Sequence, residues 1–426
     1  MNTFIIEMRP HRIRFSFILI ILFAFGQRGF CQGDYYLAPK QYSFINYDTN
    51  RLILPQNSAA FNELFSLTDS MILKGKGNIH IMHFGGSHIQ ADIYSHLTRK
   101  RLQQLAGGLT GSRGFVFPYR IAGTNNPSNY KVKYTGKWSS CKSSSNRSTC
   151  DLGISGYQVE TSDSVAEIKI YLNADSTIKY AFNKVQVFHN SSDYQLLMVT
   201  GEDSVFGVQD TTKSVSTFEL PYEFSDTVEF QFRRKSDSTL PFRLYGFNFL
   251  NDNIGYTYSS LGVNGAALKH YLKCNLYEQQ LSVVKPDVLI FSIGTNDGNT
   301  RSMNKERYRE QYSELIDRSL KAVPDAKLII TVPNDCYYYR RYPNKNTAVM
   351  QSVIFDLAKK YNAAVWDFYT IMGGFNASQA WYHSELMQYD RIHFNKKGYL
   401  LKGELFFSAF LKAWEKERTE TIQSKQ

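Results

Sequence analysis

The chain has 426 residues, of which 43% are hydrophobic and 20% are charged, which is the balance of an ordinary globular protein. This length exceeds one average domain and favours two domains together with an export segment. The formal net charge of +11 is spread along the chain without an arginine- or lysine-rich helix, so we expect no nucleic-acid partner.

Residues 1–32 have the pattern of a secretory signal peptide. Several arginines precede the apolar run FSFILIILFAF, and a short polar stretch follows it. The run of about 11 residues is too short to cross a bilayer, so we expect a secreted or periplasmic protein whose mature chain has no transmembrane span. The alternative is an uncleaved anchor. Lipid attachment at Cys31 is not expected, because the bulky Phe30 precedes it.

The first strand–helix unit follows at residues 78–105. The segment IHIMHF (79–84) alternates between apolar and polar residues and ends at two glycines. A helix is expected from Ser87 to about Leu105, and the Gly-rich segment 107–114 ends the unit.

Residues 115–250 differ in character. Short alternating runs recur about every ten residues and are separated by turn signals, a rhythm that indicates an all-β sandwich. The high aromatic content of 15% also favours strands, and surfaces that stack on sugars. The runs are YKVKY (130–134), AEIKIYL (166–172), KVQVF (184–188), YQLLMV (194–199), VEFQF (228–232) and RLYGFNFL (243–250).

The cysteines outside the signal segment divide into two groups. Cys141 and Cys150 flank a Ser/Asn/Lys-rich loop and are candidates for a disulfide in an oxidising compartment. Cys274 and Cys336 lie among apolar or aromatic residues and are expected to be buried thiols. No CxxC pair or histidine cluster has the spacing of a metal site, and we expect neither a metal nor a cofactor.

After residue 255 strands and helices alternate again. Continuous apolar runs such as DVLIFSI indicate buried parallel strands. The expected elements are strands at 287–293, 326–332 and 363–368 and helices at 304–322, 346–361 and 396–414. We therefore predict one α/β domain in two pieces, 33–114 and 251–420, interrupted by the inserted sandwich 115–250.

Several segments at expected strand ends or in loops have the residues needed for acyl transfer, which requires a nucleophile, a base, an orienting acid and oxyanion donors. Ser87 lies between a strand and a helix, after two glycines. Gly262 lies before a helix, and Asn296 follows the strand DVLIFSI. Asp390 precedes His393 by three residues, so its carboxylate can hold one ring nitrogen while the other faces a serine. Taken alone, each also has an ordinary explanation as a cap, a turn or a surface residue.

Together these residues resemble the conserved blocks of SGNH (GDSL-type) hydrolases, in the expected order. The resemblance implies a flavodoxin-like three-layer domain with a parallel sheet. It also implies a Ser87–His393–Asp390 triad and an oxyanion hole of Ser87, Gly262 and Asn296. His88 is a rival base, but its side chain should point about 100° away from Ser87 along the helix.

One position departs from the family pattern, since Gly86 stands where the family's first block usually has aspartate. The segment GGSHIQAD is also similar to a GDSHIQ variant found in peptidoglycan O-acetylesterases, some of which have a β-sandwich inserted at the same place. The resemblance therefore implies an O-acetylesterase acting on a cell-wall or related glycan.

The substrate-binding residues are less defined by the sequence. Tyr337, Tyr338 and Arg340 follow a strand end and offer stacking and cationic groups, although a packed surface loop explains them as well. Trp381 and His383 are weaker candidates. The alternatives to a wall esterase are a general carboxylesterase or lipase, a plant-polysaccharide acetylesterase, and a carbohydrate-binding protein without activity.

Overall fold

The computed structural model describes the chain from residue 42 to residue 423, apart from short gaps. These residues belong to one compact unit. The expected signal peptide, with Cys31, lies outside the described residues. None of the helices in the described part of the chain combines the length and apolar character that a membrane span requires. The described residues are 42–145, 150–173, 178–190, 193–201, 203–224, 227–235 and 239–423.

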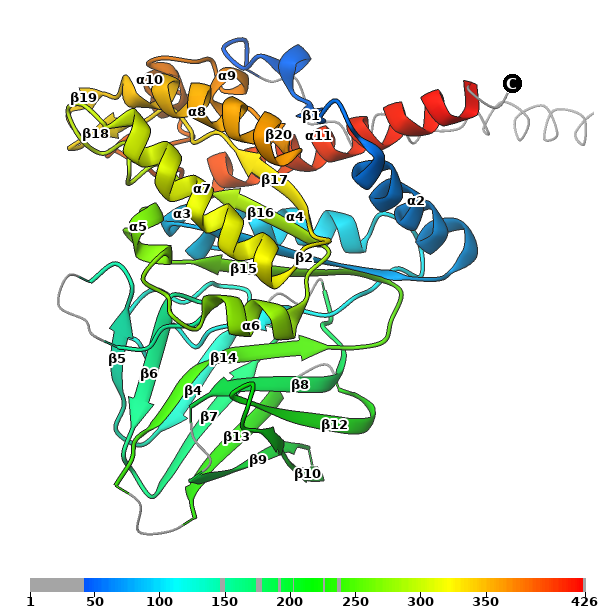
Figure 1. Cartoon of the computed structure of the whole chain (residues 1–426), viewed down its shortest axis with the longest axis vertical. Coiled ribbons are helices and arrows are strands. Elements are labelled where there is room, and N and C mark those ends of the chain that lie inside the picture. Colours follow the sequence, from blue (N-terminus) through cyan, green and yellow to red (C-terminus); the bar gives the residue numbers. More distant parts are fainter. Residues whose placement is uncertain are drawn as a thin grey trace, which may run out of the picture. The chain divides into compact units, whose positions relative to one another are not determined.

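A six-stranded sheet with the order β1-β20-β17-β16-β2-β15 forms the centre of the α/β part (Figure 1). Its strands run parallel, except that β1 pairs with β20 in the antiparallel sense. The strands are β1 Leu52–Ile53, β2 Asn78–Gly85, β15 Gly255–Gly262, β16 Val288–Ser292, β17 Lys327–Thr331 and β20 Ala364–Trp366. Sequence patterns had predicted neither β1, which has two residues, nor β15, whose GYTYSSLG lacks an aliphatic run.

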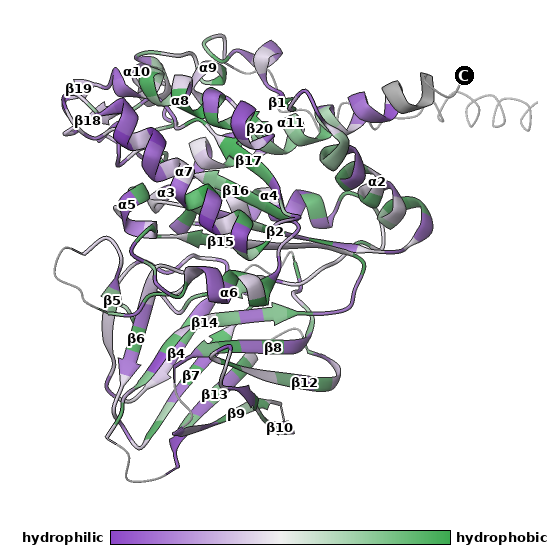
Figure 2. Cartoon of the chain, in the orientation of Figure 1, coloured by the Kyte–Doolittle hydropathy of each residue, from purple (hydrophilic) through white to green (hydrophobic). Residues whose placement is uncertain are grey.

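Helices cover both faces of this sheet and complete the predicted three layers. Val288 and Ile290 pack towards α2, α4 and α11, whereas Leu289 and Phe291 share the core with α6, α7 and α8. Because the central strands β16 and β17 are buried on both faces, they consist mainly of apolar residues, which Figure 2 shows for β17. The helices are η2 Tyr47–Thr49, α2 Ala59–Lys74, α3 Ser87–Gln90, α4 Tyr94–Gln103, α5 Leu268–Tyr271, α6 Tyr277–Val284, α7 Lys305–Ala322, α8 Asn346–Tyr361, α9 Phe368–Ile371, α10 Ala377–His383 and α11 Lys396–Gln423.

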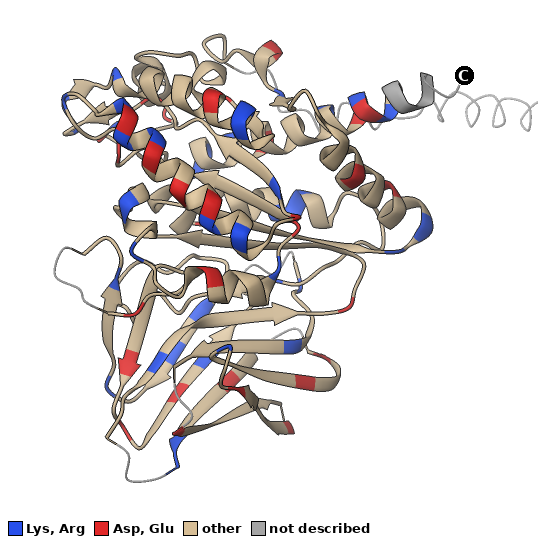
Figure 3. Cartoon of the chain, in the orientation of Figure 1, with Lys and Arg blue, Asp and Glu red and all other residues tan. Residues whose placement is uncertain are grey.

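The solvent-facing side of α7 differs from the sheet in composition. Lysine or arginine and aspartate or glutamate alternate along this helix (Figure 3). Its apolar residues, which include Tyr308, Tyr312, Leu315 and Ile316, are buried. This division is the amphipathic pattern of a helix that covers one face of a core.

The predicted continuous helix from Ser87 to Leu105 is wrong, because the chain turns at Asp92, which has a φ of 45°. The buried Asp92 carboxylate forms ion pairs with Arg99 (3.1 Å) and Arg113 (2.8 Å). Burial alone would raise the pKa of Asp92, but these two cations outweigh it and hold the pKa far below its usual range. The ion pairs fix the turn that separates α3 from α4.

Two antiparallel sheets follow in the region predicted to be a sandwich. One has the order β10-β9-β13-β7-β4 and the other β11-β12-β8-β14-β6-β5, with β3 paired to β14. The strands are β3 Gly114–Val116, β4 Lys131–Thr135, β5 Ser139–Lys142, β6 Tyr157–Thr161, β7 Val165–Tyr171, β8 Phe182–His189, β9 Tyr194–Thr200, β10 Asp203–Phe206, β11 Val208–Asp210, β12 Val215–Phe224, β13 Thr227–Arg234 and β14 Phe242–Leu250.

Aromatic side chains fill the space between these sheets. Phe230 and Phe232 of β13 meet Phe247 and Phe242 of β14, with ring centroids 4.6 and 4.7 Å apart. Much of the high aromatic content therefore forms core, as cross-sheet packing requires. The proposed domain limits of 114/115 and 250/251 stay predictions.

Cys141, at the end of β5, forms a disulfide with Cys150. Cys274 and Cys336 are buried free thiols. A small hairpin of β18 Tyr337–Tyr338 and β19 Tyr342–Pro343 lies between β17 and α8 in the chain.

Candidate active site

The predicted catalytic side chains meet at one edge of the parallel sheet. Ser87 opens α3 directly after β2, and Asn296 follows β16. Asp390 and His393 lie in the loop that leads into α11. Ligand sites of open parallel sheets form at the carboxyl ends of the strands. Ser87, Asn296 and His393 line a common pocket of about 480 Å³.

A chain of hydrogen bonds joins three of these residues. Ser87 Oγ lies 2.8 Å from His393 Nε2, and His393 Nδ1 lies 2.7 Å from Asp390 Oδ2. This is the geometry in which a histidine takes a proton from a serine while a carboxylate holds its other nitrogen. The structure thus brings together two residues that are 306 positions apart in the sequence.

The Asp390 carboxylate is held by its own loop. Its Oδ1 accepts from the backbone N–H groups of Ile392 (2.9 Å) and His393 (3.0 Å). Burial alone would raise the pKa of Asp390, but the hydrogen bonds from His393 and Ile392 outweigh burial and hold the pKa below its usual range. The carboxylate therefore stays ionised at neutral pH and can stabilise a protonated His393.

His88 is not in a position to act as the base for Ser87. Its Nδ1 lies 2.9 Å from the Tyr399 hydroxyl, and its ring centroid lies 5.2 Å from that of His393. Burial lowers the pKa of His88 well below its usual value, and the neighbouring His393 adds to this effect. His88 is therefore neutral, and its ring lies next to that of His393.

The prediction that Gly262 faces the site is wrong. Strand β15 continues to Gly262, which pairs with Gly85 of β2, and its backbone N–H donates to the Tyr119 hydroxyl (3.4 Å). A Cβ at Gly262 would lie 2.0 Å from the backbone N of Gln90, so this glycine allows α3 to pack closely on the strand. The turn comes three residues later, at Gly265, which has a φ of +79° and lines the pocket with Ser87.

The amide of Asn296 lies near Ser87. Its Nδ2 donates to the Ala266 carbonyl (2.8 Å), which leaves a second N–H on the same nitrogen. A Cβ at Gly86 would approach this Nδ2 to 3.3 Å, so the glycine that departs from the family pattern leaves room beside the donor. Within the described part of the chain, the backbone N–H groups of Ser87 and Gly265 have no protein acceptor. These groups and Asn296 can therefore receive an oxyanion.

A fully buried glutamine, Gln90, which no sequence pattern indicated, connects this site to the β-rich region. Gln90 Oε1 accepts from Asn264 N–H (2.8 Å) and the Tyr157 hydroxyl (3.0 Å). Its Nε2 donates to Thr124 Oγ1 (3.1 Å) and the Asn125 carbonyl (3.0 Å). Asn125 in turn lines the pocket with Ser87. The β-rich region thus contributes a wall of the pocket, and Gln90 joins that wall to α3.

None of the four predicted substrate-binding residues lines this pocket. Trp381 is fully buried, its Nε1 donates to the Met372 carbonyl (2.9 Å), and its assignment to the substrate site is wrong. Tyr337 is also buried, whereas Tyr338 is half-buried and Arg340 is exposed in the hairpin. Aromatic residues without a clear period can equally belong to a core, so the sequence could not separate these cases.

Among the described residues, no group of three or more His, Cys, Asp or Glu side chains is arranged to hold a metal ion.

The three-layer fold and this constellation define the SGNH class of hydrolases. The model of the GDSL-like Lipase/Acylhydrolase family matches residues 241–401, a stretch that contains Asn296, Asp390 and His393 but not Ser87. The chain therefore has a GDSL-like acylhydrolase domain and is a carboxylic ester hydrolase.

Comparison with solved structures adds to this result. A peptidoglycan O-acetylesterase is similar over 85% of this chain and 99% of its own, with a TM-score of 0.68 and 19% identity, which shows a shared fold. A lipase/acylhydrolase from Enterococcus faecalis (23% identity, TM-score 0.30) covers 36% of this chain and 75% of its own. An acetyl xylan esterase (19% identity, TM-score 0.30) covers 36% and 81%. No curated protein matches the sequence.

Proposed function

We propose that the protein is an exported serine esterase that removes O-acetyl groups from a cell-wall or related polysaccharide. Ser87 is the nucleophile, His393 the general base and acid, and Asp390 the orienting carboxylate. The observation that supports these roles is the chain of hydrogen bonds from Ser87 Oγ to His393 and from His393 to Asp390. The signal-like pattern of residues 1–32 supports export to the periplasm or the exterior.

In this mechanism Ser87 Oγ attacks the ester carbonyl while its proton moves to His393 Nε2. The backbone N–H groups of Ser87 and Gly265 and the free N–H of Asn296 donate to the oxyanion. His393 then donates the proton to the leaving sugar oxygen, and an acetyl-enzyme remains. Water, deprotonated by His393, attacks this ester, releases acetate and restores the serine.

The polar part of the pocket lining suits a sugar ester. Asn125, Asn264, Asn296 and Asn395 contribute to the walls, and the pocket is open to solvent. Amide groups of this kind donate to and accept from sugar hydroxyls. The fold likeness to a peptidoglycan O-acetylesterase supports an acetylated wall glycan as the substrate.

The test is acetate release from O-acetylated peptidoglycan by the mature chain and its Ser87→Ala variant, with acetylated xylan in parallel. The proposal predicts release from peptidoglycan that the substitution lowers by a factor of about 10⁴ or more. Acetate release from xylan alone would indicate that the enzyme acts on plant glycans instead of peptidoglycan. A folded wild-type protein that releases acetate from neither would contradict the proposal and favour a carbohydrate-binding protein.

A further inference from the structure

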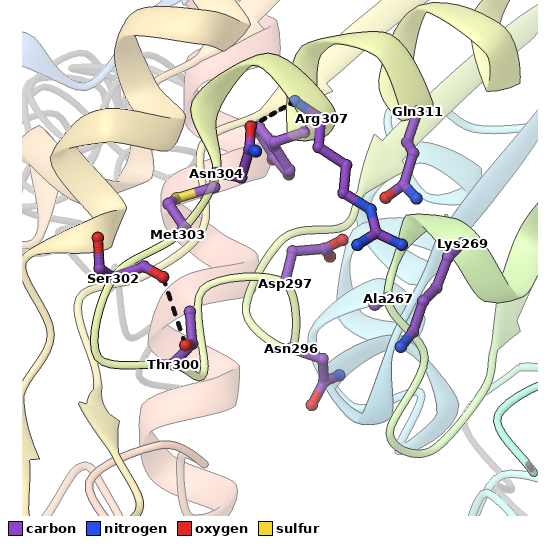
Figure 4. A pocket seen from close by; sticks show the side chains of 11 residues that line it. Ala267, Lys269, Asn296, Asp297, Thr300, Ser302, Met303, Asn304, Arg307 and Gln311 are labelled. Atoms are coloured by element: carbon purple, nitrogen blue, oxygen red, sulfur yellow. Dashed lines mark hydrogen bonds between the residues drawn. The ribbon is translucent and has the colours of Figure 1, made fainter.

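A second pocket lies next to the catalytic one and shares Asn296 with it (Figure 4). It encloses about 230 Å³, which is room for several water molecules at about 30 Å³ each, or for a substituent of a bound sugar. Its walls come from the segment around α5, the loop after β16 and the first turns of α7. Asn296 faces the catalytic pocket, and the next residue, Asp297, lies at the floor of the second one.

Two cations point into this pocket. Figure 4 shows the guanidinium group of Arg307, from α7, and the ammonium group of Lys269, from α5, reaching into the pocket beside Asp297 and Asn296. Within the described part of the chain, neither cation forms an ion pair. Two like charges that point into one pocket without forming a close ion pair attract an anion to that pocket.

The acid at the floor does not cancel this positive charge. Asp297 Oδ1 accepts from the Leu268 N–H (3.0 Å), and its buried Oδ2 has no hydrogen-bond partner in the described structure. Burial raises the pKa of Asp297 to about 7, so much of the carboxyl is protonated at neutral pH. In that form Oδ2 is a donor that lacks an acceptor.

The rest of the lining is uncharged and includes the apolar side chains of Ala267 and Met303. Thr300, Ser302, Asn304 and Gln311 contribute hydroxyl and amide groups. Among the described residues that line the pocket, Asp297 is the sole acid. Cationic and hydrogen-bond donors around a solvent-open cavity suit an oxygen anion and suit neither a metal cation nor an acyl chain.

We propose that this pocket is an anion subsite, in which Lys269 and Arg307 hold a carboxylate of the acetylated glycan while its ester lies at Ser87. The inference rests on the proposed function and narrows its substrate class to glycans that have a carboxylate near the acetylated sugar. The subsite selects such glycans over neutral acetylated ones.

The test compares an O-acetylated peptidoglycan fragment with free carboxylates and the same fragment after its carboxylates are converted to methylamides. The wild-type protein should prefer the free carboxylates in kcat/KM. Lys269→Ala and Arg307→Ala should each lower this preference by up to about fivefold, the upper end for solvent-exposed ion pairs. Lys273→Ala and Lys305→Ala, which remove exposed cations outside the pocket, should keep it.

Equal kcat/KM values for the two fragments in the wild type would overturn the subsite, and so would an equal loss in the control variants. The same comparison is made for binding by calorimetry in the Ser87→Ala background, where no turnover is needed. Preferential binding that depends on Lys269 and Arg307 would support the subsite even if no ester were cleaved. Acetate release without any carboxylate preference would leave the proposed function intact and remove the subsite.

Discussion

Substitution of Gln90 by alanine tests whether the insert is part of the catalytic site. The change removes every hydrogen bond of a side chain that is 1% exposed. Asn264 N–H and the Tyr157 hydroxyl then lose their buried acceptor. Each such loss costs about 1–3 kcal/mol, so we expect the free energy of unfolding to fall by about 2–6 kcal/mol.

The expected effect on activity follows from the neighbour of Asn264. Gly265 is the next residue, and its backbone N–H is an oxyanion donor in the proposed mechanism. Loss of one such donor costs about 10²–10³ in kcat, so its partial displacement in Gln90→Ala should lower kcat at least about tenfold. The assay is hydrolysis of p-nitrophenyl acetate together with urea unfolding.

Gln158→Ala is the matched control, because Gln158 is a buried glutamine in β6 that does not line the pocket. It should lower stability but keep kcat. If Gln90→Ala lowered the free energy of unfolding as predicted while kcat stayed at the wild-type value, the proposed coupling between Gln90 and the oxyanion donor would be refuted.

Two further predictions concern stability. Asp92→Asn leaves Arg99 and Arg113 buried without a counter-ion and should cost about 3–5 kcal/mol in urea unfolding. The pKa of Asp92 is depressed in the folded state, so its contribution to the free energy of unfolding is complete above the unfolded pKa of about 3.9 and is lost as the pH falls through the folded pKa. The stability of Asp92→Asn should therefore depend less on pH in the acid range than that of the wild type. An unchanged acid dependence would contradict this role of Asp92. Substitution of both Cys141 and Cys150 by serine should lower the free energy of unfolding by about 2–3 kcal/mol, measured under non-reducing conditions, and no change would mean that the disulfide does not form in solution.

The parts of the site that follow strands with clear patterns could be predicted from the sequence. Ser87 follows the alternating run IHIMHF and Asn296 follows the apolar run DVLIFSI, and both runs are typical of strands. The DxxH spacing of Asp390 and His393 allows the hydrogen bond of 2.7 Å between them. The residue types and the order of the strands were sufficient to predict the positions of these residues.

The remaining errors arise where distant contacts decide the local structure. Gly262 and Gly265 are three residues apart, and the pairing of β15 with β2 decides which of them lies in the turn. Asp92 breaks the predicted helix because of Arg113, 21 residues away. Trp381 is buried by Phe368 and Phe394, which no local pattern connects to it.

The central claim is that Ser87 accepts the acyl group, and trapping of the acyl-enzyme tests it most directly. The protein is mixed with an excess of an activated acetyl ester, quenched in acid during turnover and mapped by peptide mass spectrometry. The account predicts one added acetyl group on the peptide that contains Ser87, and none in Ser87→Ala. An acetyl group on another residue, or steady acetate release with an unmodified Ser87 and an active Ser87→Ala protein, would contradict it.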